Sequence, residues 1–151
     1  MLTMSRDRKI RRARGRTALA AGLAVTAAMA VPVSAEAAVA ASASTSNPTS
    51  KASAKWNWVS GTTLNSINLT VSDVGCDSEP VFARFRVTRV NGDYFFTQKR
   101  YDYTGCDTED STTYTGLSLS DGYNIKNVRL QVCDDAGRWC SYSAAKDNPY
   151  T

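Results

Sequence analysis

The most constraining feature of this sequence is the stretch from Asn127 to Ser143, which combines strand periodicity, turn residues and two cysteines. Apolar residues alternate with polar ones over residues 128 to 133, the two-residue period of a strand with one buried face. Turn-forming residues follow over 134 to 138, and extended character resumes at Trp139. The stretch therefore predicts a β-hairpin.

The two cysteines of this hairpin, Cys133 and Cys140, fall directly opposite each other if Ala136 and Gly137 form a two-residue tip. Gly137 suits such a turn because glycine takes a positive φ without steric cost. The Cβ atoms of opposed residues in an antiparallel pair lie close enough for a disulfide. We therefore expect a covalently closed hairpin.

The other two cysteines lie in nearly repeated acidic pentapeptides, Gly75 to Glu79 and Gly105 to Glu109. With the hairpin closed, a bond between Cys76 and Cys106 is favoured among the three pairings that four cysteines allow. That bond would gather five carboxylates, which are hard oxygen ligands for Ca²⁺. They are Asp77, Glu79, Asp107, Glu109 and Asp110. No calcium-loop spacing is present, so we expect solvated loop charges and no metal or cofactor.

The start of the chain has the pattern of a secretory signal peptide. Residues 1–16 carry seven Lys and Arg and one acid, and an Ala-rich apolar run follows from Ala18 to Val33. Small residues at Ala35 and Ala37 predict cleavage after Ala37, so residues 1–37 are expected to be removed on export. A membrane anchor is the alternative, disfavoured because the run is short and dominated by Ala. We expect a secreted protein without membrane contact after cleavage.

Removal of this signal peptide changes the charge of the protein. The whole chain has a formal net charge of +4, whereas residues 38–151 carry 11 basic and 12 acidic side chains, a net charge of −1. A basic excess would favour nucleic acid or an anionic membrane as partner, but this excess leaves with the signal peptide. We therefore exclude nucleic acid as a partner, and we expect a monomer.

Composition also divides the remaining chain in two. Residues 38–54 are small and polar with almost no large apolar side chain, so they predict a flexible linker that buries too little surface to fold. Residues 55–151 hold all fourteen aromatic residues and all four cysteines. They are expected to form one small domain whose disulfides compensate for a small core.

The domain over 55–151 reads as strands throughout, with no amphipathic helical run. Asn91 and Gly92 are a strong hairpin signal between two of the strands. Besides the two strands of the hairpin at 127–143, strands are expected at 56–59, 67–72, 81–88, 94–103 and 114–119. About seven short strands predict an all-β fold, a small disulfide-bonded antiparallel β-sandwich or barrel.

The chain contains no His. This excludes Ser-His-Asp and Cys-His catalysis and every zinc site that uses His ligands. A carboxylate-based hydrolase is the surviving enzymatic alternative, but it needs two acids fixed across a cleft, and the acids here lie in loops of a small domain. We therefore expect no enzymatic activity.

A non-catalytic extracellular binding module remains, with a glycan, a cell-wall polymer or a protein as partner. The strands hold more aromatic residues than one small core needs, and exposed rings on a sheet suit sugar or protein contacts. The candidates are Trp56, Trp58, Tyr94, Phe96, Tyr101 and Tyr103. The alternative is a secreted enzyme inhibitor that uses the loop of the hairpin from Cys133 to Cys140, with Arg138 and Trp139 near its turn.

Overall fold

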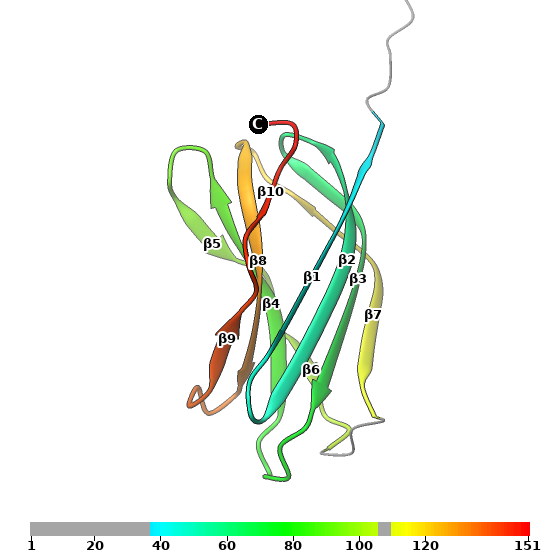
Figure 1. Cartoon of the computed structure of the whole chain (residues 1–151), viewed down its shortest axis with the longest axis vertical. Helices are drawn as coiled ribbons and strands as arrows, with labels where there is room; N and C mark the ends of the chain where they lie inside the picture. The colour runs from blue at the N-terminus through cyan, green and yellow to red at the C-terminus, as the bar shows by residue number, and fades with distance from the viewer. Residues whose placement is uncertain (1–36, 106–109) are drawn as a thin grey trace, which may run out of the picture. The chain divides into compact units, whose positions relative to one another are not determined.

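Strands account for all the regular secondary structure of residues 37–105 and 110–151, which are the residues that the computed structural model describes. Four of the strands form an antiparallel sheet, the first sheet, in the order β1-β2-β3-β7 (Figure 1). They are β1 (Val39–Ser46), β2 (Ser50–Ser60), β3 (Thr63–Asp73) and β7 (Thr112–Ser120).

The second sheet is built on the long antiparallel pair of β4 (Val81–Arg89) and β8 (Ile125–Asp134). Four short strands flank this pair, β5 and β6 on β4, and β9 and β10 on β8. They are β5 (Tyr94–Phe96), β6 (Arg100–Asp102), β9 (Cys140–Tyr142) and β10 (Lys146–Asp147). The described residues thus hold ten strands where about seven were expected, because β1 and β10 were not predicted and residues 97–99 interrupt the strand predicted over 94–103.

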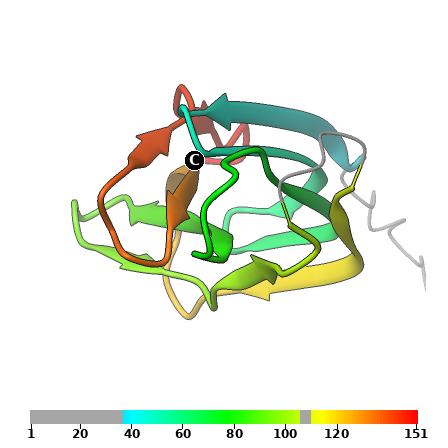
Figure 2. The same cartoon turned by 90° about the horizontal axis from the view of Figure 1, so that it is seen from below.

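The two sheets lie face to face, so the predicted all-β antiparallel fold is confirmed and takes the sandwich form (Figure 2). Inward-facing residues of both sheets form one buried cluster. Trp56 and Trp58 of β2 belong to it, and the ring centroid of Trp56 lies 5.6 Å from that of Phe85 on β4 in an edge-to-face contact. Each large apolar side chain buried in this way contributes about 1.5 to 3 kcal/mol to stability.

The prediction of a flexible linker over residues 38–54 is wrong, because this segment forms β1 and the first half of β2. All eight residues of β1 pair with β2, from Val39 opposite Trp58 to Ser46 opposite Lys51. The side chains of Ala43, Ala52 and Ala54 are buried in the core cluster. Small residues fit here because burying Ala costs no side-chain entropy. The sandwich therefore begins near Val39, well before the boundary predicted at residue 55.

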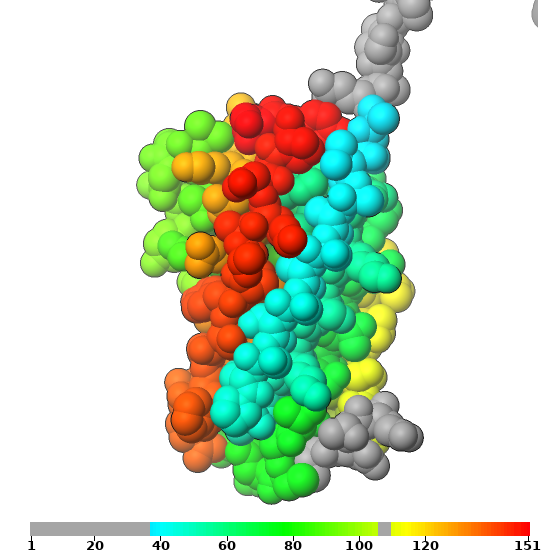
Figure 3. Space-filling view, viewed as in Figure 1, coloured from blue at the N-terminus to red at the C-terminus, as the bar shows by residue number. Residues whose placement is uncertain are grey.

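β1 also closes one lateral side of the sandwich. Figure 3 shows β1, in cyan, running alongside the segment of β9 and β10, in orange and red. The Thr45 hydroxyl donates a hydrogen bond to the Ser141 hydroxyl at 3.0 Å, and the Tyr150 hydroxyl donates one to the carbonyl of Ala37. The Ala-rich strand thereby covers the core at the edge where the two sheets would otherwise separate.

The hairpin between β8 and β9 has the predicted register. Cys133 lies opposite Cys140, and the two form a disulfide, which confirms this predicted bond. The turn differs by one residue from the predicted tip. The N–H of Gly137 donates to the carbonyl of Asp134 at 3.0 Å, so Asp135 and Ala136 are the central residues. Gly137 follows them with a φ of 72°, the left-handed conformation that favours glycine.

Removing this disulfide by the double change Cys133→Ala and Cys140→Ala is expected to lower the free energy of unfolding by about 2.5 kcal/mol. The reason is the entropy that the unfolded chain regains when the loop of eight residues opens. Urea unfolding followed by circular dichroism measures the change. The exposed residue Ala136 gives a control, Ala136→Ser, which should shift stability by less than about 0.5 kcal/mol. Equal stability of the double variant and the native protein would contradict the prediction.

Asp102 of β6 joins the two sheets at one end of the sandwich. Its side chain is buried, and Oδ2 accepts a hydrogen bond from the N–H of Asp73 on β3 at 3.0 Å. Oδ1 accepts from the Thr104 N–H at 3.1 Å, the Thr104 hydroxyl at 2.7 Å and the Thr112 hydroxyl of β7 at 2.8 Å. Because Asp73 and Thr112 belong to the first sheet, this carboxylate holds both sheets in place.

Candidate functional site

The outer face of the second sheet carries a group of aromatic rings interleaved with positive charges, which we call the cation–aromatic face. Its position follows from the strand period, because Val81, Ala83, Phe85 and Val87 point into the core and the alternate side chains of β4 point outward. Pairing with β5 and β6 brings further rings beside them. The face consists of Phe82, Arg84, Arg86, Tyr94, Phe96, Lys99, Tyr101 and Tyr103.

Arg84 lies at the middle of this face. The Cζ atom of its guanidinium is 3.8 Å from the ring centroid of Phe96 and 5.5 Å from that of Phe82. Its Nε donates to Oε1 of Gln131 at 2.7 Å, and Nε2 of Gln131 lies 2.7 Å from the hydroxyl of Tyr142. The guanidinium is therefore fixed in place by two rings and one hydrogen bond, which reduces the entropy it would lose on binding a partner.

The neighbouring pair of Arg86 and Tyr94 repeats this arrangement. The Cζ atom of Arg86 is 4.2 Å from the ring centroid of Tyr94, and Tyr94 contacts Phe96 edge to face at 5.9 Å. Tyr94 is 55% exposed, so one side of its ring faces solvent. The Nε atom of Arg86 is buried without a hydrogen-bond partner in the described structure. A rigid aromatic ring backed by a positive charge is thus presented to solvent.

Lys99 connects the face to the hairpin loop. Its Nζ lies 4.1 Å from the ring centroid of Phe82 and donates to Oδ1 of Asp135 at 2.9 Å. The Tyr101 hydroxyl donates to the same oxygen at 3.0 Å. The hydrogen bond from Lys99, followed by that from Tyr101, holds the pKa of Asp135 below its ordinary value. The bond to Asp135 likewise raises the pKa of Lys99, so both groups are charged at neutral pH.

The six aromatic candidates from the sequence fall into two groups. Tyr94, Phe96, Tyr101 and Tyr103 lie on the cation–aromatic face, and Tyr103, 74% exposed, stacks on Tyr101 with a centroid distance of 5.4 Å. Their role in binding stays a prediction.

Trp56 and Trp58 do not lie on this face. They are 2% and 1% exposed, and both belong to the core cluster. The prediction that they contact a partner is therefore wrong, because the inward face of β2 buries both rings. Neither Nε1 atom has a hydrogen-bond partner among the described residues, which is consistent with a purely apolar role in packing.

Several members of the site were missed by sequence reasoning. The missed members of the face are Phe82, Arg84, Arg86 and Lys99. Gln131, which bonds to both Arg84 and Tyr142, supports the face from β8. One signal was present in the sequence, since Phe82, Arg84 and Arg86 occupy the polar phase of an alternating strand. A large ring on the outward phase of a strand, beside two Arg residues, indicates a cation–π surface. In the structure Phe82 is only 4% exposed, because Arg84, Lys99 and Tyr101 pack against its ring.

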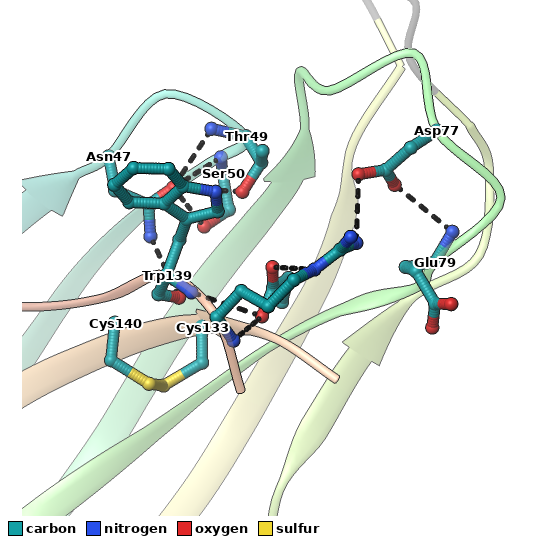
Figure 4. A network of polar contacts seen from close by, with 10 residues as sticks. Asn47, Thr49, Ser50, Asp77, Glu79, Cys133, Trp139 and Cys140 are labelled. Carbon is teal, nitrogen blue, oxygen red and sulfur yellow. Dashed lines mark hydrogen bonds and ion pairs between the residues drawn. A yellow bond between two sulfur atoms is a disulfide. The ribbon is translucent and has the colours of Figure 1, made fainter. Parts of the chain in front are cut away.

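The loop of the hairpin forms a second candidate surface, at the end of the sandwich. Figure 4 shows Trp139 and the turn of Asn47, Thr49 and Ser50 joined through the amide of Asn47. Nδ2 of Asn47 donates to the carbonyl of Trp139 at 3.3 Å, while Oδ1 accepts from the N–H groups of Thr49 and Ser50 at 3.0 and 2.8 Å. Sequence reasoning missed Asn47 because it lay in the presumed linker.

Buried Asp134 fixes the backbone of this loop. Its Oδ1 accepts from the N–H groups of Arg138 at 2.7 Å and Trp139 at 3.2 Å. The Arg138 guanidinium lies 3.6 Å from the other oxygen of Asp134 and 3.5 Å from a carboxylate oxygen of Asp77. Trp139 is 50% exposed, so the loop presents one large ring on a rigid, disulfide-closed support.

The acidic loops offer less to a ligand. Cys106, Asp107 and Glu109 lie outside the described residues, so the predicted Cys76 to Cys106 bond stays a prediction. Of the described acids, Asp77 accepts the N–H of Glu79 and pairs with Arg138. Within residues 37–105 and 110–151, no group of three or more Cys, Asp or Glu side chains is placed to hold a metal ion.

No family model, no curated protein and no solved structure matches this chain. The part of the chain that the structure describes has no helix long and apolar enough to span a membrane. The predicted signal peptide lies almost wholly among residues 1–36, which are not described. The class of protein that the described residues define is therefore an antiparallel β-sandwich closed by a disulfide hairpin.

Proposed function

We propose that this chain is a secreted, non-catalytic binding domain whose contact surface is the cation–aromatic face. The observation that carries the proposal is the pairing of guanidinium groups with aromatic rings on the outer face of the sheet. Arg84 lies 3.8 Å from the half-buried ring of Phe96, and Arg86 lies 4.2 Å from the exposed ring of Tyr94. Cations held on aromatic rings give a surface that offers both stacking and charge to a partner.

A glycan that carries acidic groups fits this surface best. Sugar rings stack on exposed aromatic faces such as those of Tyr94 and Tyr103, while carboxylates meet Arg86 and Arg84. Among the described side chains of the cation–aromatic face the charges are all positive, and the nearby carboxylate of Asp135 is neutralised by Lys99. Acidic polymers of a cell wall are therefore the expected partners.

The double change Arg86→Gln and Tyr94→Ala is expected to weaken binding to an acidic polysaccharide at least tenfold, because it removes one charge and one exposed ring from the face. Binding of the purified protein to immobilised polygalacturonate, compared with neutral dextran, measures this. Binding should also fall as salt is raised, since exposed charges are screened within about 10 Å at 0.1 M salt.

A matched control removes the same types of group elsewhere. Lys55→Gln with Tyr123→Ala takes one cation and one exposed Tyr from outside the face, and should leave binding unchanged. Equal loss in both double variants would show that the face is not the contact surface. Equal retention on dextran and polygalacturonate would show that acidic groups are not recognised.

An enzyme inhibitor that uses the hairpin loop is the second candidate. The observation that favours it is the exposure of Trp139 on a loop already fixed by Asp134, Asn47 and the disulfide. Arg138→Ala with Trp139→Ala discriminates the two functions. Loss of a captured extracellular hydrolase in this double variant alone would favour the inhibitor, because a central Trp or Arg commonly contributes about 2 kcal/mol or more to an interface.

A further inference from the structure

The two lateral sides of the sandwich differ. One side is closed by β1 against β9 and β10, as Figure 3 shows. On the other side, between β7 and the short strands β5 and β6, a cavity of about 320 Å³ leads to the core. Its apolar wall consists of Ile67, Leu69, Phe85, Phe95, Leu117 and Leu119.

The interruption of the sheet edge explains this opening. β5 pairs with β4 from Arg86 to Thr88, and β6 pairs with β4 from Val81 to Ala83, so neither strand covers Phe85. Thr97 bridges the gap: its hydroxyl oxygen accepts a hydrogen bond from the N–H of Phe85, and its own N–H donates to the carbonyl of Phe85, each at 2.9 Å. The side chain of Phe85 therefore borders both the core cluster and the cavity.

The rim of the cavity carries one positive charge, that of Arg100. The Cζ atom of Arg100 lies 5.3 Å from the ring centroid of Tyr114, and no carboxylate of the described residues is within ion-pair distance of it. Arg89, by contrast, makes two hydrogen bonds to Asp121 at 2.7 and 3.0 Å. Arg100 is thus a half-buried cation beside an apolar cavity, and no acid among the described residues compensates its charge.

We propose that this cavity binds a small amphiphilic anion, an aliphatic chain of about eight carbons whose carboxylate meets Arg100. The apolar wall takes the chain, and the guanidinium takes the head group at the rim through charge-assisted hydrogen bonds. The volume limits the ligand to a small one, because small-molecule sites start at roughly 300 Å³. This site lies between the sheets and is separate from the cation–aromatic face, so it does not depend on the function proposed above.

Titration of the purified protein with octanoate and with 1-octanol tests the proposal. Octanoate is expected to bind saturably and to shift the NMR methyl signals of Ile67, Leu69, Leu117 and Leu119. Arg100→Gln is expected to weaken octanoate binding about tenfold and to leave octanol binding unchanged, since only the anion uses the guanidinium. Arg100→Lys, which keeps the charge, should retain most of the affinity.

Two further variants complete the test. Leu117→Trp fills the cavity and should abolish binding of both ligands, with an unchanged circular dichroism spectrum showing that the variant folds. Arg129→Gln removes an exposed Arg from β8 and is the charge-matched control, expected to bind octanoate as the native protein does. No saturable octanoate binding, methyl shifts away from the cavity, or equal loss in Arg100→Gln and Arg129→Gln would each overturn the proposal.

Discussion

Trp58→Ala is expected to lower the free energy of unfolding by about 3 to 5 kcal/mol, because it empties one of the largest side-chain sites in the core. Trp58 is 1% exposed and its ring centroid lies 6.3 Å from that of Trp56. Its Nε1 has no hydrogen-bond partner within residues 37–105 and 110–151, so the expected cost comes from lost burial and the cavity left behind. Since small domains are stable by about 5 to 15 kcal/mol, this one change removes a large share of stability.

Urea unfolding followed by far-ultraviolet circular dichroism is the appropriate measurement, because the change removes a fluorophore. Trp139→Ala provides the matched control, in which the same ring is removed from an exposed loop position. It should cost less than about 1 kcal/mol. Similar losses in the two variants would mean that Trp58 is not a core residue and would restore it as a candidate contact.

The hairpin of β8 and β9 could be predicted from the sequence because two independent signals agree there. The alternation over residues 128 to 133 fixes which face is buried, and the opposed cysteines fix the register. The predicted tip, Ala136 and Gly137, was displaced by one residue, because the hydrogen bond of the turn joins Asp134 and Gly137 and so makes Asp135 and Ala136 the central residues. Local spacing alone does not distinguish a two-residue tip from a longer turn that ends on a left-handed glycine.

β1 and the start of β2 were missed because the residues that they bury in the core, Ala43, Ala52 and Ala54, are all alanines. The two-residue period is present in the sequence, since Ala52 and Ala54 share the inward phase of Trp56 and Trp58, and Lys51, Ser53 and Lys55 point outward. A search for alternating large apolar residues misses this pattern, because alanine is small. Small side chains gain stability only when another layer comes close, which is a property of the tertiary structure.

The same phase relation decides which aromatic residues are available for binding. Counting aromatic residues indicated that there are more of them than the core needs, but not which of them face solvent. Assigning Trp56 and Trp58 to the buried face requires the alternation along the whole of β2, back to Ser50. For β5, the outward position of Tyr94 and Phe96 follows from their pairing with Thr88 and Arg86 of β4. That pairing is set by tertiary structure and cannot be read from a three-residue strand alone.

The second large effect expected is that of Asp102→Ala, which should lower the free energy of unfolding by about 3 to 4 kcal/mol at pH 7. The carboxylate of Asp102 accepts hydrogen bonds from the N–H of Asp73, from Thr104 and from Thr112. Each donor left buried without a partner costs about 1 to 3 kcal/mol, partly recovered where water enters. Because Asp102 belongs to the second sheet and the donors Asp73 and Thr112 belong to the first, the loss should appear as cooperative unfolding of the whole sandwich in urea.

The pH dependence of stability distinguishes Asp102 from its neighbour Asp73. Burial alone would raise the pKa of Asp102, but the hydrogen bonds from Thr104, Asp73 and Thr112 outweigh it and hold the pKa below its ordinary value. The stability that ionised Asp102 contributes is therefore complete above its unfolded pKa of about 3.9 and is lost as the pH falls through its lower folded pKa. The difference between the native protein and Asp102→Ala should shrink over that acidic range.

Asp73 should show the opposite dependence. Burial raises its pKa, the N–H of Gly75 lowers it in part, and the charges of Asp77 and Asp102 raise it further. A folded pKa above the unfolded value means that ionised Asp73 opposes folding at neutral pH, and that this cost disappears as the pH falls below its unfolded pKa. Asp73→Asn should therefore match or exceed the native stability at pH 7 and lose that advantage in acid. Destabilisation by Asp73→Asn at pH 7 as large as that of Asp102→Ala would show that the Asp73 carboxylate supports the fold as Asp102 does.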